Sequence, residues 1–199
     1  MLLPVEIAWL PTFGDNKLAG SYKVGVWYNT SNTPDVFENT QGKALAVAGG
    51  QPRGRDGAYG AYLSFVQKLT NPSATDPDQG LSAFFNATVA DRRTAAVDSQ
   101  IAIGVKYAGL LSFRPKDDIA LAFGRTQVNS RVALGEELQN AAGLGPVPVQ
   151  GSEYVAELYY TIHATDWLNL RPNIQYVHQP GGISQTDDVI LGLKMSANF

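Results

Sequence analysis

Apolar side chains recur at every second position through most of this chain, and the helical period of about 3.6 residues is nearly absent. Between residues 20 and 28 the odd positions are mostly small or polar, and the even positions are Gly20, Tyr22, Val24, Val26 and Tyr28. A period of two is the signature of a β-strand with one apolar face. The pattern therefore predicts an all-β protein.

The same alternation predicts about nine strands, joined as an antiparallel meander. They cover residues 3–10, 20–28, 59–69, 81–89, 101–107, 119–124, 153–163, 168–176 and 189–199. Two long connections, 30–56 and 129–152, are predicted to be loops, and the others are shorter. The tight link near 164–167 favours a three-residue loop, either 164–166 or 165–167, because facing residues must share a face. The absence of an internal repeat beyond the hairpins predicts one β-barrel domain over residues 1–199.

A soluble barrel and a membrane barrel both fit this meander, and the composition of the two faces distinguishes them. The polar face holds mainly Gly, Ala, Ser, Asn and Gln with single charges, whereas the exposed face of a soluble barrel is rich in charged residues. Tyrosines lie near strand ends on the apolar face, as expected at a lipid–water boundary: Tyr28, Tyr107, Tyr154 and Tyr176. Alternating long and short connections fit extracellular loops and periplasmic turns. The sequence therefore predicts an up-and-down transmembrane β-barrel.

Composition and charge exclude several other classes of protein. Charged residues make up 17% of the chain, below the roughly 25% of soluble domains, and the net charge of −3 gives no support to nucleic-acid binding. The chain has no cysteine and no apolar run long enough for a transmembrane helix. Residues 1–10 lack the features of a secretory signal, so we expect any export signal to lie outside this sequence. His163 and His178 belong to no motif, and we predict no catalytic residue, no metal site and no cofactor.

The last strand carries an alternating apolar row that ends on an aromatic residue. Leu191, Leu193, Met195, Ala197 and Phe199 resemble the final strand of bacterial outer-membrane barrels. In that class the terminal aromatic and its alternating partners are read by the barrel assembly machinery. The resemblance therefore implies an assembly signal at Leu193, Met195 and Phe199.

Longer segments resemble the carbohydrate-selective porin family, OprB. They are "AELYYTIHATDWLNLRPNIQYVHQPGG" (156–182) with "LGLKMSANF", "VKYAGLLSFRPKDDIALAFGRTQVN" (105–129) and "GSYKVGVWYNT" (20–30). The resemblance covers the chain from about Trp9 and is patchy in the two long connections. It implies passive diffusion of monosaccharides such as glucose, or of short oligosaccharides, through the bacterial outer membrane. It also implies contact with lipid and lipopolysaccharide, and it is compatible with a homotrimer.

Family members are barrels of about sixteen strands and roughly twice this length. Nine strands cannot close as a standard bacterial barrel with both termini periplasmic, and an open edge in hydrocarbon leaves backbone groups unsatisfied. We therefore expect the chain to be the C-terminal half of such a porin.

A sugar channel needs a wet lumen lined by donors, acceptors and aromatic rings. By parity, nine such residues share the polar face: Trp27, Tyr62, Lys106, Glu157, Tyr159, Arg171, Asn173, Gln175 and Lys194. The hairpin of 153–163 and 167–178 brings Glu157, Tyr159, Arg171 and Asn173 together as a candidate sugar-contacting wall. For Glu157 and Arg171 we favour a cross-strand pair that only stiffens the wall, and direct contact with a solute is the alternative. Arg53 and Arg55 are expected to be exposed loop charges rather than part of a constriction.

Two other functions have requirements that the pattern meets less well. A non-transport barrel with structural or adhesive loops 30–56 and 129–152 would be plugged by bulky inward residues, whereas Gly and Ala are common on the polar face. A barrel enzyme such as a lipase would need Ser, His and an acid on the outer face. His163 points inward by parity, and His178 lies at a strand end.

Overall fold

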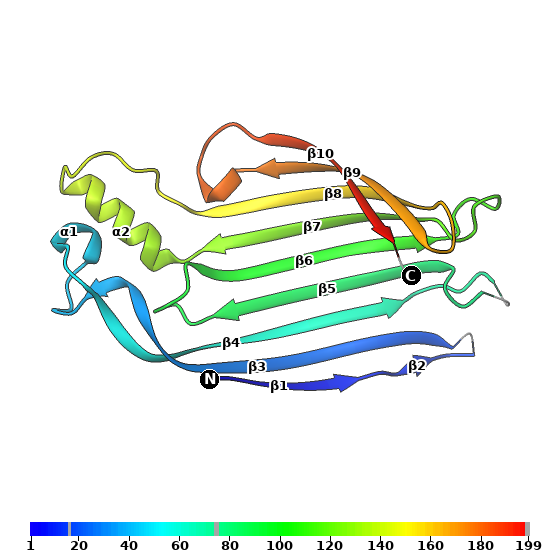
Figure 1. Ribbon diagram of the computed structural model, residues 1–199, viewed down its shortest axis with the longest axis horizontal. Helices are drawn as coiled ribbons and strands as arrows, with labels where there is room; N and C mark the ends of the chain where they lie inside the picture. The colour runs from blue at the N-terminus through cyan, green and yellow to red at the C-terminus, as the bar shows by residue number, and fades with distance from the viewer. Residues whose placement is uncertain (16, 74–75, 198–199) are drawn as a thin grey trace.

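The computed structural model describes residues 1–15, 17–73 and 76–197, which form one curved antiparallel sheet (Figure 1). Neighbouring strands follow the order β1-β3-β4-β5-β6-β7-β8-β9-β10, with the short β2 paired to β3. The strands are β1 (Leu2–Trp9), β2 (Thr12–Phe13), β3 (Leu18–Asn39), β4 (Pro52–Lys68), β5 (Gly80–Ala90), β6 (Val97–Ala108), β7 (Asp118–Val128), β8 (Ser152–His163), β9 (Leu168–His178) and β10 (Asp188–Ala197). The helices are α1 (Leu45–Ala48), α2 (Ser130–Ala141) and the 3-10 turn η1 (Pro180–Gly182). The prediction of an all-β antiparallel meander is confirmed.

The prediction that 30–56 is a loop was wrong for most of that segment. β3 continues to Asn39 and β4 begins at Pro52, so the two strands extend well beyond β1 and β5. Their pairing shifts register between Asn29 and Asn32 and again between Pro34 and Asn39. Such irregular pairing breaks the two-residue alternation, which is why the extension could not be recognised in the sequence.

The second long connection also holds regular structure, because α2 occupies Ser130–Ala141. Its apolar residues include the consecutive Val132, Ala133 and Leu134, so they do not form one stripe of helical period. Among the described residues, no helix is long and apolar enough to cross a membrane.

The tight β8–β9 turn follows the predicted register rule. Tyr154 faces His178 and His163 faces Asn169, and the numbers of each pair have the same parity. The backbone N–H of Ala164 donates to the carbonyl of Leu168 at 3.0 Å. This bond selects 165–167 from the two predicted loops.

The apolar face of the sheet is left exposed by the described residues. The exposed fractions of Val26, Ile103 and Leu191 are 52%, 54% and 79%. Buried apolar residues are few and small: Ala58, Ala108, Ala120 and Val177. Burying apolar area contributes about 25 cal/mol per Å², so a face of this kind requires lipid or another apolar partner.

Aromatic rings form a belt across the outer face near one end of the sheet. The ring of Trp9 lies 5.3 Å from that of Tyr22, which lies 5.5 Å from Phe65, and Phe65 lies 6.4 Å from Phe85. Towards the other end, Tyr28, Tyr59 and Tyr154 are exposed on the same face. Aromatic girdles at both interfaces are typical of transmembrane β-barrels.

The two ends of the sheet differ. We call the end that carries α1, α2 and η1 the helical end, and the end with the β1–β3, β4–β5, β6–β7 and β8–β9 connections the hairpin end (Figure 1). β1 pairs only with β3, and β10 only with β9, in the described part of the chain. The sheet is therefore open at both of these strands.

Candidate functional site

The nine side chains predicted to face the lumen lie on one face of the sheet. The register carries this face across the strands, because Lys106 pairs with Ala120, Ala120 with Tyr159, and Tyr159 with Asn173. Arg171 pairs with Lys194 one row closer to the hairpin end. On the opposite face lie the apolar and aromatic residues described above. We call the polar face the lumen face.

Four of the predicted residues form a polar cluster on β8 and β9, which we call the wall cluster: Glu157, Tyr159, Arg171 and Asn173. Asn173 Nδ2 donates to Glu157 Oε1 at 2.7 Å, and the Arg171 guanidinium lies 4.2 Å from the centre of the Tyr159 ring. Gln175 faces Glu157 across the strands. The structure therefore brings together the residues that the hairpin was predicted to assemble.

The predicted pairing of Glu157 with Arg171 was wrong. Arg171 Nε instead donates to Thr161 Oγ1 at 2.8 Å, and the Thr161 hydroxyl donates to Asp118 at 3.2 Å. The register causes this, because Glu157 faces Gln175 and Arg171 lies further along the strand towards the hairpin end. Among the described residues no carboxylate pairs with Arg171, and its guanidinium lies over the Tyr159 ring.

Aromatic side chains on β3 and β4 lie across glycines of the neighbouring strand. A Cβ at Gly60 would lie 2.6 Å from the Trp27 indole, and a Cβ at Gly25 would lie 2.3 Å from the Tyr62 ring. The Tyr62 hydroxyl also donates to Glu6 at 2.6 Å. Glycine at these positions lets each ring lie flat on the lumen face. Trp27 and Tyr62 are several strands away from the wall cluster.

Phe84 is a lumen-face aromatic residue that is not among the nine predicted lumen residues. It faces Gly104, where a Cβ would lie 2.5 Å from the Phe84 ring. The sequence signal was available, because Phe84 alternates with the apolar row of β5 and faces a glycine on the next strand.

Two lumen-face lysines, Lys106 and Lys194, have no hydrogen bond or ion pair with any residue that the structure describes. Both are exposed, whereas the lumen-face Lys23 lies 3.7 Å from Glu6. Unpaired ammonium groups on a wet wall are free to donate to a solute.

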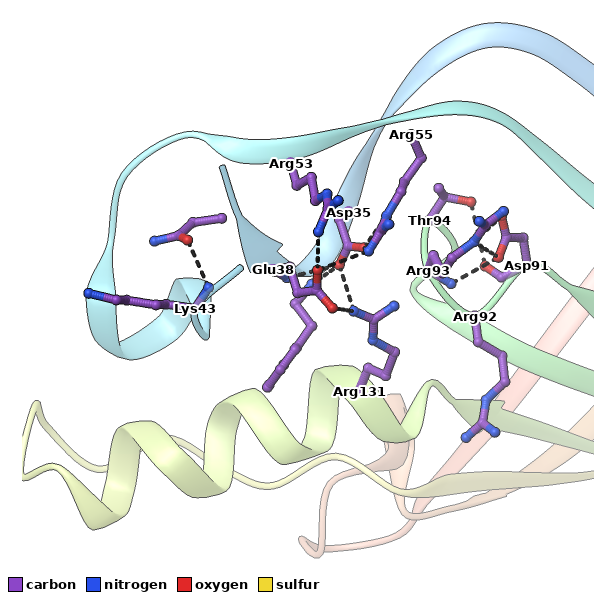
Figure 2. Close-up of polar contacts among 12 residues, drawn as sticks. Asp35, Glu38, Lys43, Arg53, Arg55, Asp91, Arg92, Arg93, Thr94 and Arg131 are labelled. Carbon is purple, nitrogen blue, oxygen red and sulfur yellow. Dashed lines mark hydrogen bonds and ion pairs between the residues drawn. The ribbon is translucent and has the colours of Figure 1, made fainter. Parts of the chain in front are cut away.

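At the helical end, charged side chains form a second group, which we call the loop cluster: Asp35, Glu38, Arg53, Arg55 and Arg131. Figure 2 shows the three arginines converging on the two acids. Asp35 accepts from Arg55 Nε at 2.7 Å and from Arg131 Nη2 at 3.0 Å, and its side chain is fully buried. Glu38 binds Arg53 at 3.1 Å and Arg55 at 3.0 Å. The cluster ties the β3–β4 extension to α2.

The expectation that Arg53 and Arg55 are both exposed loop charges was therefore wrong for Arg55, whose side chain is only 19% exposed. The acids that hold it, Asp35 and Glu38, were missed because their segment was read as a loop. Only the folded register of β3 with β4 brings these charges together.

Beside the loop cluster, Asp91 is buried where β5 ends and pairs with Arg93 at 2.9 Å (Figure 2). Burial alone raises the pKa of Asp91. The side-chain and backbone hydrogen bonds from Arg93 outweigh that effect, so the pKa lies below its ordinary value.

Two of the three predicted assembly residues, Leu193 and Met195, lie on the outer face of β10. Leu193 and Met195 are 71% and 70% exposed, and Phe199 lies outside the described residues. Neither histidine belongs to a group of three or more possible metal ligands in the part of the chain that the structure describes. His163 Nδ1 has no hydrogen-bond partner there, and His178 Nδ1 lies 2.9 Å from Asp187.

Comparison with known proteins agrees with the geometry. The family described as "Carbohydrate-selective porin, OprB family" matches residues 1–199. Porin B of Pseudomonas aeruginosa is 39% identical over 100% of this chain and 45% of its own length. A structure of Pseudomonas putida OprB at high pH superposes with a TM-score of 0.92 and 37% identity, covering 100% of this chain and 48% of that one. Its structure at low pH gives a TM-score of 0.65 and 29% identity, with 100% and 46% covered.

The chain thus spans about half the length of the relatives it matches. These similarities indicate a β-barrel protein of the bacterial outer membrane. The match over the whole chain, together with an antiparallel sheet that is apolar outside and polar inside, shows that the chain belongs to the OprB family of carbohydrate-selective porins.

Proposed function

We propose that this chain forms the C-terminal part of a water-filled channel through which sugars such as glucose, or short oligosaccharides, diffuse passively. The observation that carries the proposal is the wall cluster on the lumen face. Glu157 accepts, Asn173 and Arg171 donate, and the Tyr159 ring offers a flat surface within a few ångströms of them. A sugar presents hydroxyl groups at its edges and C–H groups on its faces, so this combination of groups suits it.

Closure of the barrel is part of this proposal. The free backbone groups of β1 and β10 would be unsatisfied in hydrocarbon, at several kcal/mol for each group. Further strands that pair with both edges remove this cost and enclose the lumen face. The single domain then continues beyond the strands described here. The outer face contacts lipid and lipopolysaccharide, and the β10 row is offered to the assembly machinery.

The lumen face supports a channel rather than a plugged or catalytic barrel. Small residues recur on it between the larger polar side chains: Gly25, Gly60, Gly104, Ala120, Ala122 and Gly192. At the glycines, neighbouring side chains lie against the backbone of the sheet and not across the lumen. A low wall of this kind favours hydrated passage, and a diffusion channel requires no covalent chemistry.

Conductance in planar lipid bilayers tests the proposal. The protein expressed from its complete gene should form ion-conducting pores, and added glucose or maltose should reduce the current by occupying the lumen. Glu157→Gln combined with Asn173→Ala should weaken this sugar effect, whereas Gln127→Ala combined with Ser152→Ala on the outer face should leave it unchanged. Pores whose current is insensitive to both sugars would refute the proposal.

A further inference from the structure

A cavity of about 630 Å³ opens on the lumen face at the hairpin end. Its floor is made by lumen-face side chains of β4, β5 and β6, among them Lys68, Ser82 and Lys106. Its rim comes from two connections of the same end, through residues 76–79 and 115–116. Small-molecule sites have volumes of about 300–1,000 Å³, so the cavity is large enough for a sugar.

Several charged side chains that line the cavity already bind other groups of the protein. Lys68 Nζ donates to the carbonyl of Pro77 and holds that connection over the floor. Lys116 pairs with Asp166 at 2.7 Å, and Asp118 accepts from a threonine hydroxyl. These groups build the walls and have little capacity left for a ligand.

Three other polar groups of the cavity have no side-chain hydrogen bond or ion pair within the described ranges. They are the ammonium group of Lys106, the hydroxyl of Ser82 and the carboxylate of Asp78. Ser82 and Lys106 face each other across β5 and β6, so a donor and a hydroxyl stand side by side. Across the whole cavity three lysines balance three aspartates: Lys68, Lys106, Lys116, Asp76, Asp78 and Asp118. Balanced charge with free donors and acceptors suits a neutral polyhydroxylated ligand better than an anion.

The cavity also adjoins the wall cluster. Asp118 and His163 line it, and the same two residues line a second hollow of about 100 Å³ together with Arg171 and Lys194. A solute that leaves the wall cluster therefore meets this cavity next on its way to the hairpin end.

We propose that this cavity is a second binding site for a neutral sugar, with Lys106, Ser82 and Asp78 as its ligand-contacting groups. The proposal rests on the channel function proposed above and adds a separate site to it. Sugars would then cross the hairpin end by transfer from one site to another rather than by free diffusion.

Thiol labelling can test occupancy of the cavity, because the chain has no cysteine of its own. Ser82→Cys is introduced into the protein expressed from its complete gene, and its reaction with a methanethiosulfonate reagent is followed by the loss of current. Ser64→Cys is the matched control, since Ser64 lies on the lumen face of β4 but does not line the cavity. Glucose at about ten times its Kd should slow labelling of Ser82→Cys by roughly tenfold and leave Ser64→Cys nearly unchanged.

The chemistry of the site gives a second test. Lys106→Gln should weaken protection by glucose roughly tenfold, as expected for loss of a charged donor, whereas Lys23→Gln elsewhere on the lumen face should not. Gluconate should protect less than glucose, and the reverse order would overturn the assignment to a neutral sugar.

Equal or absent protection at the two cysteines, in a channel whose current glucose still reduces, would overturn the second site and leave the channel function standing. A current insensitive to glucose would instead remove the channel function on which the site rests.

Discussion

At the scale of single residues, Asp35 has the most demanding environment in the loop cluster. Its buried carboxylate binds Arg55 and Arg131 and also accepts backbone N–H bonds from Phe37 at 2.8 Å and Glu38 at 2.9 Å. Removing one partner of a buried ion pair leaves charges uncompensated and costs about 3–5 kcal/mol. Because the two arginines are each about one-fifth exposed, we expect the lower end of this range for Asp35→Asn.

Denaturant unfolding of the variant in detergent measures this loss, and hydrogen exchange locates it. Amides of α2 and of the β3–β4 connection should exchange faster in Asp35→Asn. Asp56→Asn is the matched control, because Asp56 lies exposed on β4 of the same hairpin. Equal effects of the two substitutions would show that the loop cluster does not anchor α2.

Asp117 lies in the β6–β7 connection, and its environment predicts that the stability of the hairpin end depends on pH. Burial alone raises the pKa of its carboxyl, but bonds from Arg114, from the backbone N–H of His163 at 2.9 Å and from the Tyr160 hydroxyl at 2.8 Å outweigh burial. The pKa therefore lies below its ordinary value of 3.8. A lowered pKa stabilises the folded state fully above that ordinary value, and this stabilisation is lost as the pH falls through the folded pKa.

We therefore expect Asp117→Asn to reduce stability by about 1–3 kcal/mol at neutral pH and progressively less below pH 3.8. The free energy of local opening at His163, obtained from hydrogen exchange and corrected for the intrinsic rate, measures this difference. If the difference in opening free energy between Asp117→Asn and the unsubstituted protein stays constant from neutral to acidic pH, the charge of Asp117 is not its cause.

At the scale of the element, a buried residue at the start of α2 caps the helix. Asn129 Oδ1 accepts from the backbone N–H of Arg131 at 2.9 Å, and Asn129 Nδ2 donates to the carbonyls of Arg92 at 2.6 Å and Ala95 at 2.7 Å. Asn129 has no exposed surface. It therefore caps the helix and also fixes the β5–β6 connection beside it.

Asn129→Asp separates these two roles. Aspartate keeps the capping acceptor, yet it replaces two donated bonds by repulsion between its carboxylate and two carbonyls, so we expect a loss of about 1–3 kcal/mol. The exposed Asn140→Asp is the matched control, since Asn140 also bonds through both side-chain atoms. Thermal unfolding in detergent compares them, and a variant at Asn129 as stable as that at Asn140 would contradict this account.

The same element shows where sequence patterns stop being informative. Strands such as Tyr154–Ile162 were predictable, because alternation is a local property and one face meets lipid. α2 and the extension of β3 were not, because polar partners from distant segments stabilise them in place of an apolar stripe. Parity likewise placed the nine lumen residues on one face, but it could not decide between Arg171 and Asn173 as the partner of Glu157. That choice depends on the exact loop at 165–167 and on the side-chain rotamers.

At the scale of the whole molecule, the lumen face and the outer face require different surroundings for the sheet to be stable. The outer face needs lipid, and the lumen face needs an enclosing wall, because the open strands β1 and β10 carry unpaired backbone groups. Residues of the loop cluster and of the hairpin end stabilise their own ends of the sheet, but no strand pairing among the described residues joins β1 to β10. We therefore expect closure to require additional strands.

This requirement leads to a prediction about residues 1–199 expressed alone. Refolded in detergent, they should migrate at the same position on a gel with and without heating, because a sheet with two open edges lacks the resistance to detergent of a closed barrel. The product of the complete gene is the control and should shift on heating. A clean heat-dependent shift of residues 1–199 would contradict the prediction, and cross-linking through cysteines placed at Val5 and Leu193 would then show whether β1 meets β10 of the same copy or of a second one. Either pairing would mean that these edges are complementary to each other. Pairing within one copy would further mean that residues 1–199 close without any additional strand.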